Sequence, residues 1–236
     1  MWVYLWVDGP AYLCFTAEQA NSTIQLTNSW TPTAVSLETS TNLSTWSDYT
    51  IWNTITLSSV GDKVYWRNKS ETPTWFSTGN SNRYRFALTG SIAASWDVTY
   101  LLCKTGTDAL QGNYCFSGLF VNNTSLTSAP SLPATTLTWY CYYEMFSYCS
   151  NLTTIPRLPA TTLQYRCYSQ MFYNCSKIKL SESQTWEYQT PYRIPAEWTW
   201  TDADYALDSM FSNTGGTFVG SAYVNTTYYT SNTIIS

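Results

Sequence analysis

The chain of 236 residues contains no histidine, and only 11% of its residues are charged. Histidine is the most frequent general base and metal ligand in proteins, so its absence argues against the common catalytic and zinc sites. Eleven lysines and arginines against fifteen aspartates and glutamates give a net charge of -4 and no basic stripe for a phosphate backbone. We therefore expect no nucleic-acid partner, no bound metal and no other cofactor.

Long hydrophobic runs are missing as well. The opening MWVYLWVDGP holds seven consecutive apolar residues, but no lysine or arginine precedes them and no small-residue cleavage pattern follows. Such a segment is not typical of a signal peptide, and no window approaches the roughly 20 apolar residues of a membrane-spanning helix. We expect no membrane insertion and synthesis without export, with residues 1–12 as an apolar segment that anchors the chain to a partner or to its own next domain.

Aromatic residues, in contrast, make up 17% of the chain. A core of this size cannot absorb so many rings, so many of them are expected at surfaces or interfaces, where rings suit contacts with proteins or with sugar faces. The alternative is that they only fill strand faces. The seven cysteines form an odd set, so at least one thiol is free or bonded to another chain.

An internal repeat dominates the second half of the chain. Residues 132–157 and 158–183 share twelve identities in twenty-six positions. An eroded copy lies upstream, with Asn123 where later copies have their second cysteine, and a last copy from Ala206 follows an insertion of about thirteen residues. A period of this length is typical of a short unit that buries its apolar face only by stacking on its neighbours. The sequence therefore predicts a solenoid.

Within one copy, apolar residues recur at every fourth position from Leu137 to Cys149, which predicts one inward face of a helix. Leu152 and Ile155 then predict a brief strand that ends at a turn with Pro156. Strands of successive copies would pair in parallel about 4.8 Å apart, so that like side chains stack into internal columns. The predicted columns are Cys115, Cys141 and Cys167; Phe120, Phe146 and Phe172; and Leu126, Leu152 and Ile178.

The cysteine columns are interpreted as buried free thiols. A ladder would set the Cβ bonds of stacked cysteines side by side instead of toward each other, which disfavours disulfides. Zinc is disfavoured because the spacing within a copy is C-x7-C and no histidine can complete a site.

The pattern LPATTL...CYxxMFxxCSxLTTxP resembles the BspA-like leucine-rich repeats, which occur in surface proteins of gut bacteria, in some protozoa and in gut bacteriophage proteins. The resemblance is specific over residues 113–180 and weaker to about residue 220. Upstream, LCFTAEQANSTIQL, DYTIWNTITLSSVGDKVYWRN and YRFALTGSIAAS resemble, more loosely, a small β-domain that often precedes such repeats. The resemblance implies a non-enzymatic adhesion or recognition scaffold and assigns no catalytic residues.

The first half alternates polar and apolar residues in short runs separated by turn signals, which predicts a β-sandwich of about seven strands, immunoglobulin-like in shape. Val64 and Trp66 are expected on one face, and Lys63, Tyr65 and Arg67 on the other. The predicted fold class is therefore α+β in two units: a sandwich domain over residues 13–90, then a leucine-rich-repeat solenoid over residues 91–236 with a C-terminal cap. No linker separates them, so we expect rigid packing.

Catalytic motifs are missing. The glycines frame no G-x-S-x-G nucleophile elbow, and no phosphate-binding loop occurs. Asp202 and Asp204, with Glu197, could hold a cation, but the glycine-containing loop typical of calcium sites is absent, so these residues are interpreted as solvated surface. The chain is not expected to be an enzyme.

The first functional hypothesis is a bacteriophage virion protein, as a tail or head fibre component or a capsid decoration, assembled in the host cytoplasm. Its partners would be other virion proteins, copies of itself, and a protein or glycan of the host surface. The second is a bacterial cell-surface adhesin, and the third a glycan hydrolase with tryptophan platforms. If these rings do more than shield the solenoid, the candidate binding residues are Trp139, Tyr140, Tyr165, Arg166, Trp186, Trp198 and Trp200.

Overall fold

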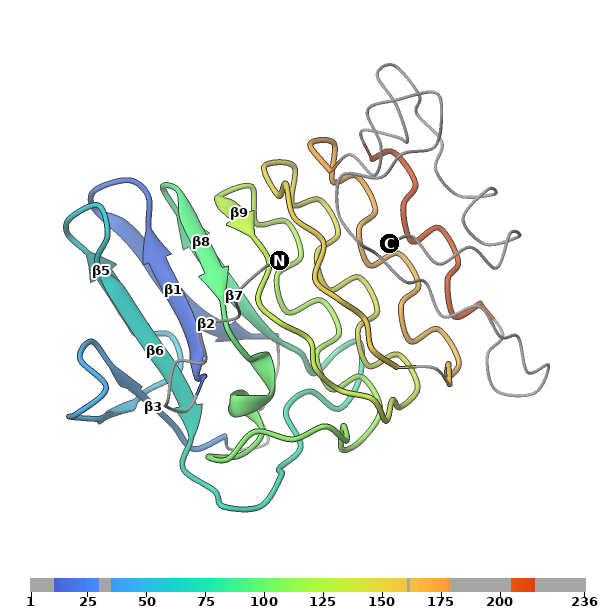
Figure 1. The fold of residues 1–236 in the computed structure, drawn as a ribbon, viewed down its shortest axis with the longest axis horizontal. Coiled ribbons are helices and arrows are strands. Elements are labelled where there is room, and N and C mark those ends of the chain that lie inside the picture. Colours follow the sequence, from blue (N-terminus) through green and yellow to red (C-terminus); the bar gives the residue numbers. More distant parts are fainter. Residues whose placement is uncertain (1–10, 30–34, 161, 179–204, 215–236) are drawn as a thin grey trace, which may run out of the picture.

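The computed structural model describes residues 11–29, 35–160, 162–178 and 205–214 (Figure 1). Most of the predicted apolar segment, the insertion that holds Trp186, Trp198 and Trp200, and the residues after 214 lie outside this set. The elements are β1 (Leu13–Ala17), β2 (Ser22–Asn28), β3 (Leu37–Ser40), β4 (Ser47–Tyr49), β5 (Thr54–Leu57), β6 (Lys63–Asn68), β7 (Tyr84–Thr89), β8 (Ile92–Ser95), the 3-10 helix η1 (Val98–Leu101) and β9 (Leu126–Ser128).

The predicted α+β fold class is wrong. Across the described ranges, the only helical element is the four-residue η1, and every strand belongs to one of two sheets. The leucine-rich-repeat solenoid of helix, strand and turn is therefore not the structure of the second half. The described chain is almost entirely strands and turns.

The fourfold spacing that predicted a helix belongs to a ribbon of consecutive turns. Tyr140, Glu144 and Tyr148 have φ of 58°, 54° and 62°, a left-handed residue at every fourth position. An α-helix of L-residues does not accommodate such residues. Both structures bring every fourth side chain to one face. In an α-helix, four residues complete about one helical turn. In the ribbon, four residues span two successive hydrogen-bonded turns. The apolar period alone could not distinguish them.

Backbone hydrogen bonds explain why the ribbons stack. Alternate amides close turns, as when Met145 N donates to Tyr142 O at 3.1 Å. The amides between them bond the next copy: Tyr142 N donates to Cys167 O and Phe146 N to Met171 O, both at 2.9 Å. Turn and inter-copy bonds together satisfy the backbone, as a buried chain requires. We name the four copies ribbon 1 (114–123), ribbon 2 (140–149), ribbon 3 (166–175) and ribbon 4 (205–214).

Identical side chains stack along the ribbons. Phe120 lies 5.4 Å from Phe146 between ring centroids, and Phe146 lies 5.5 Å from Phe172, with interplanar angles of 4° and 5°. The column continues to Phe211 in ribbon 4 and back to Phe86 in β7. All members of the other two predicted columns are fully buried: Cys115, Cys141, Cys167, Leu126, Leu152 and Ile178. All seven cysteines of the chain are buried free thiols.

Two sheets pack face to face beside the ribbons. Their strand orders are β4-β3-β6-β1-β8-β9 and β5-β2-β7. Phe15 of β1 and Trp66 of β6 contact Phe86 of β7 across the interface, at centroid distances of 4.8 and 5.2 Å. On the outer face of the larger sheet, Tyr65 is also buried, in a second cluster with Tyr12 and Cys14.

The sheets merge with the ribbons, and no break coincides with the predicted boundary at residue 90. Strand β8 lies between β1 and β9, and Phe86 N donates to Leu119 O of ribbon 1 at 2.8 Å. One hydrophobic core contains residues of both sheets and of all four ribbons. Figure 1 shows the sheets at one end of the molecule and the repeat copies stacked beyond β9.

Candidate functional site

Four of the seven predicted binding residues come together on the surface of the ribbons. Trp139, Tyr140, Tyr165 and Arg166 share ring contacts with two residues that the prediction did not include, Tyr114 and Tyr205. Trp186, Trp198 and Trp200 lie outside the described residues. We name the following set the aromatic strip: Tyr114, Trp139, Tyr140, Tyr165, Arg166 and Tyr205.

Ring contacts run through the strip without interruption. Tyr114 stacks on Tyr140 at 4.5 Å between centroids, with an angle of 9°. Tyr140 then meets Tyr165 edge to face at 5.3 Å, and Tyr165 meets Tyr205 in the same way at 6.2 Å. Trp139 packs edge to face on Tyr165, also at 6.2 Å. Each such contact stabilises the pair by about 0.5–1.5 kcal/mol beyond area burial, so the rings hold one another in place.

The ribbon backbone places these side chains. Tyr114, Tyr140, Arg166 and Tyr205 are the first, left-handed residue of ribbons 1 to 4, with φ between 51° and 63°. Each of these four side chains therefore projects from the equivalent position of its ribbon. Tyr114 N donates to Trp139 O and Tyr140 N to Tyr165 O, both at 2.9 Å, which brings residues of successive copies side by side. The same in-register bonds that build the core thus also build the strip.

The strip is partly open to solvent. Trp139 is 47% exposed and Tyr205 is 56% exposed, whereas Tyr114, Tyr140 and Tyr165 are half-buried. The half-buried rings support the exposed ones.

Arg166 is the only charged member of the strip. Its guanidinium carbon lies 5.0 Å from the ring centroid of Tyr205 and 5.7 Å from that of Tyr165. A hydrogen bond with Tyr165 raises the pKa of Arg166. Burial, together with the hydrogen bond to Tyr165, raises the pKa of Tyr140 to about 12. At neutral pH the strip therefore carries one cation among neutral rings.

A partly buried ion pair borders the strip. Arg83 Nη1 lies 3.0 Å from Glu144 Oε2, and the Arg83 guanidinium carbon lies 5.9 Å from the Tyr143 ring centroid. Tyr143 in turn packs edge to face on Tyr140 at 5.6 Å. Burial, followed by the charge of Glu144, raises the pKa of Tyr143 to about 12. Burial, followed by the charge of Arg83, lowers the pKa of nearby Arg85, so this group contains two cations and one anion.

The five cysteines of the ribbons are unsuited to nucleophilic chemistry. Burial raises the pKa of Cys167 and of Cys175 to about 12 and raises those of Cys115, Cys141 and Cys149 as well. A reactive cysteine needs an accessible thiolate, which these sites do not provide. No group of three or more Cys, Asp or Glu side chains in the described ranges could hold a metal ion.

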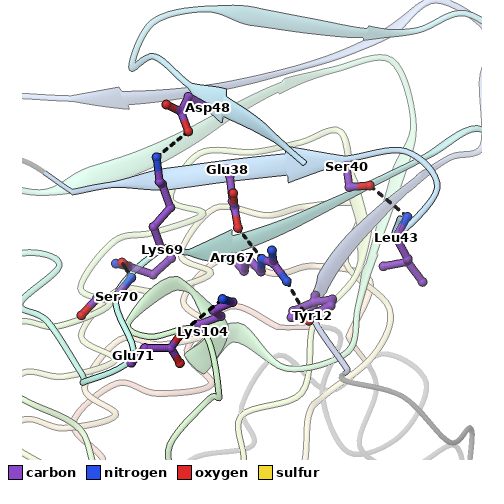
Figure 2. Close-up of polar contacts among 11 residues, drawn as sticks. Tyr12, Glu38, Ser40, Leu43, Asp48, Arg67, Lys69, Ser70, Glu71 and Lys104 are labelled. Atoms are coloured by element: carbon purple, nitrogen blue, oxygen red, sulfur yellow. Dashed lines mark hydrogen bonds and ion pairs between the residues drawn. The ribbon is translucent and has the colours of Figure 1, made fainter. Parts of the chain in front are cut away.

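Arg67 makes a second arrangement of rings and charge, on the outer face of the larger sheet (Figure 2). Its guanidinium carbon lies 3.8 Å from the Trp46 ring centroid, its Nε pairs with Glu38, and its Nη1 donates to Tyr12 Oη at 3.0 Å. The side chains of Arg67 and Glu38 are each only 13% exposed. Because Arg67 is satisfied from inside the protein, this arrangement stabilises the sheet and offers little to a ligand.

The sequence contained a signal for the two missed members of the strip. Tyr114 lies twenty-six residues before Tyr140, and Tyr205 stands directly before Ala206, as Tyr140 stands directly before Cys141. Trp75 is another exposed ring, outside the strip, that precedes the repeats and that the sequence analysis did not single out. It is 57% exposed and lies against Gly112, where an added Cβ would be 3.1 Å from Trp75 Cδ2.

Comparison with known proteins gives no match for this chain, whether with family models, with curated proteins or with solved structures. The resemblance of the repeats to the BspA-like family therefore stays a prediction from the sequence. Among the residues that the structure describes, no helix has the length and apolar character needed to cross a membrane.

Proposed function

We propose that this protein is a non-enzymatic structural component of a bacteriophage virion, a fibre component or a capsid decoration, that recognises a glycan or protein of the host surface through the aromatic strip. The observation that carries the proposal is the continuous row of supported rings, two of them about half exposed, across four stacked ribbons.

Preorganisation favours recognition over a purely structural role for these rings. Flat aromatic side chains give a large contact area for little conformational entropy, and their neighbours already restrict those of the strip. Shielding the ribbons requires the half-buried tyrosines but not Trp139, which extends from the end of the preceding segment and is 47% exposed. A neutral surface with one arginine suits the face of a sugar ring and its hydroxyl groups.

A bacterial cell-surface adhesin is the alternative, because the same strip would serve it equally well and because the repeats resemble those of bacterial surface proteins. Low charge and many aromatic residues favour a virion protein, which is largely covered by other subunits. Mass spectrometry of purified virus particles from the source organism separates the two proposals. Detection of the chain in washed particles supports the first, and detection only on cells supports the second.

Recognition by the strip is tested with the pair Trp139→Ala and Tyr148→Ala. Both residues are exposed aromatics near ribbon 2, at 47% and 48%, but Tyr148 lies at the other end of the ribbon. We expect Trp139→Ala to weaken binding to host cells or to an array of host glycans by roughly tenfold or more, as for an aromatic hot spot, while Tyr148→Ala changes it little. Equal binding by the two variants would remove the strip from consideration.

A further inference from the structure

Two arginines lie on the outer face of the smaller sheet, where β7 borders ribbon 1. Tyr84 and Phe86 of β7 are buried in the core at 1% and 2% exposure, and successive side chains of a strand point to opposite faces. Ser29 N donates to Arg83 O at 3.3 Å, which continues the pairing of β2 with β7 by one residue. Arg83 and Arg85 therefore share the face that points away from the core.

Arg83 is held by partners within the protein. Its Nε donates to Asn80 O at 3.0 Å, and its Nη1 donates to Ser117 Oγ at 3.3 Å and to Glu144 Oε2 at 3.0 Å. Ribbon 1 leaves room for it with a glycine, because an added Cβ at Gly118 would lie 2.7 Å from Arg83 Nη1. Arg83 is only 7% exposed, so it joins β7 to the ribbons and is not available to a ligand.

Arg85 differs from Arg83 because its guanidinium has no partner among the described residues. Its Nε is the only one of its nitrogens that is both buried and unpaired, so its two Nη groups are open to solvent. Burial, followed by the charge of Arg83, lowers the pKa of Arg85, and the charge of Glu144 opposes this effect. Arg85 therefore lacks a counter-charge of its own, and its planar fork is available to an anion.

Positive charge is in excess on this surface. Three of the six arginines of the chain lie here: Arg83, Arg85 and Arg166. The carboxylates whose charges act on them are Glu144 and Asp208, one fewer than the arginines. The chain as a whole has a net charge of -4. This surface is therefore opposite in sign to the rest of the protein, which favours the approach of an anion.

Ring contacts connect this surface to the aromatic strip. The Arg83 guanidinium carbon lies 5.9 Å from the Tyr143 ring centroid, and Tyr143 packs on Tyr140 at 5.6 Å. Tyr143 also lies within the electrostatic influence of Arg166, the cation of the strip. A ligand that stacks on the strip can thus extend across Tyr143 toward Arg85.

We propose that Arg85 binds the carboxylate or sulfate of an acidic glycan whose sugar rings stack on the aromatic strip. This inference rests on the function proposed above and narrows its ligand. Arginine binds such groups through two parallel hydrogen bonds, and the row of rings offers one flat face after another to successive sugars. An acidic peptide fits less well, because it would bring several carboxylates to a surface where one guanidinium is without a partner.

A titration followed by nuclear magnetic resonance tests the anion site directly. Sodium glucuronate is the probe, glucose is its neutral counterpart, and the arginine Nε–H signals are the readout. We expect the Arg85 signal to shift and saturate with glucuronate but not with glucose. The Arg67 signal should not move, because Arg67 pairs with Glu38 and donates to Tyr12. An Arg85 signal that responds equally to both sugars, or to neither, would overturn the proposal.

A glycan array with carboxylated, sulfated and neutral members tests the preference for acidic ligands. We expect the unmodified protein to bind an acidic glycan about tenfold or more tightly than its neutral form. Arg85→Gln should lose this preference, and Arg85→Lys should retain part of it, because lysine keeps the charge without the fork. Lys63→Gln is the matched control, because it removes one exposed charge from β6 of the other sheet.

The outcomes separate this inference from the function on which it rests. Equal binding of acidic and neutral glycans, lost in Trp139→Ala, would contradict the role of Arg85 but leave recognition by the strip intact. No binding to any glycan would contradict both. Tighter binding of a polyglutamate peptide than of every acidic glycan would show that the anion belongs to a protein, and the proposal would be wrong.

Discussion

At the scale of single residues, the left-handed positions decide the fold of the repeats. Ribbon 1 has Gly118 at its second left-handed position with φ of 62°, and Asn122, Asn174 and Asn213 hold the third position in ribbons 1, 3 and 4. Glycine and asparagine are the residues that tolerate this conformation best. These glycine and asparagine residues were the sequence signal for turns in place of a helix. Tyrosine and glutamate at the equivalent positions of ribbon 2 concealed it.

Asn122 provides the test of this interpretation. It is exposed, has φ of 64° and donates its backbone N–H to Ser147 O at 2.8 Å. We expect Asn122→Val to lower the free energy of unfolding by about 1–2 kcal/mol, because a β-branched side chain is strained at positive φ. Asn122→Gly should remain near the stability of the unmodified protein. Denaturant unfolding measures both, and equal stability of the two variants would contradict the left-handed assignment.

At the scale of elements, Asn123 joins a strand to a ribbon. In ribbons 2 and 3, the thiols of Cys149 and Cys175 each donate to a phenylalanine carbonyl of the preceding ribbon, at 3.0 Å. Ribbon 1 has β7 as its neighbour instead. There the Asn123 amide accepts from Leu88 N at 2.9 Å and donates to Phe86 O at 2.7 Å. The departure from the repeat pattern, visible in the sequence, thus marks the junction.

Restoring the repeat residue, cysteine, at this junction should therefore lower the stability of the protein. Asn123→Cys would leave Leu88 N buried without its acceptor, and an unsatisfied buried amide costs about 1–3 kcal/mol. We expect a lower free energy of unfolding and faster hydrogen exchange at the Leu88 amide. If the variant matches the unmodified protein in both measurements, the Asn123 side chain contributes nothing net to the junction.

The sequence predicted period, register and column members of the repeats but not their backbone. Column members follow from spacing alone, because any in-register stack places residue n on residue n+26. Whether the segment forms a helix or turns depends on the φ angle at residues such as Tyr140 and Glu144. Tyrosine and glutamate are not residue types that indicate a positive φ. The candidate site was partly predictable for the same reason: Tyr140 and Arg166 share a repeat position, and Tyr114, which was missed, precedes Tyr140 by one period.

At the scale of the whole molecule, sheets and ribbons share one core. Phe15 of β1 lies 6.1 Å from Phe120 of ribbon 1 between ring centroids, and Phe86 stacks on the same ring at 5.4 Å. The repeats therefore have a sheet, not solvent, at their first end. A boundary drawn from the change in sequence pattern at residue 90 could not reveal this, because a shared core depends on contacts distant in the sequence.

The shared core predicts how stability depends on pH. Burial raises the pKa of the Cys167 and Cys175 thiols from 9.0 to about 12. Below pH 9 these thiols are protonated in both the folded and the unfolded chain, so their contribution to stability is fully present. Between pH 9 and 12 only the unfolded chain releases the protons, so the free energy of unfolding falls by about 1.4 kcal/mol per pH unit for each independent thiol.

We therefore expect cooperative unfolding at alkaline pH, with thiolate absorbance appearing in the same transition as the loss of near-ultraviolet circular dichroism. Cys167→Ala is the informative variant, because Ala206 occupies the equivalent place of ribbon 4 and is buried there at 2% exposure. Above pH 9, its free energy of unfolding should decline less steeply with pH than that of the unmodified protein. The difference in slope should correspond to at most one proton fewer released on unfolding. Titration of the thiols near pH 9 in the folded protein would show that the columns admit water, and the stacked core would then be wrong.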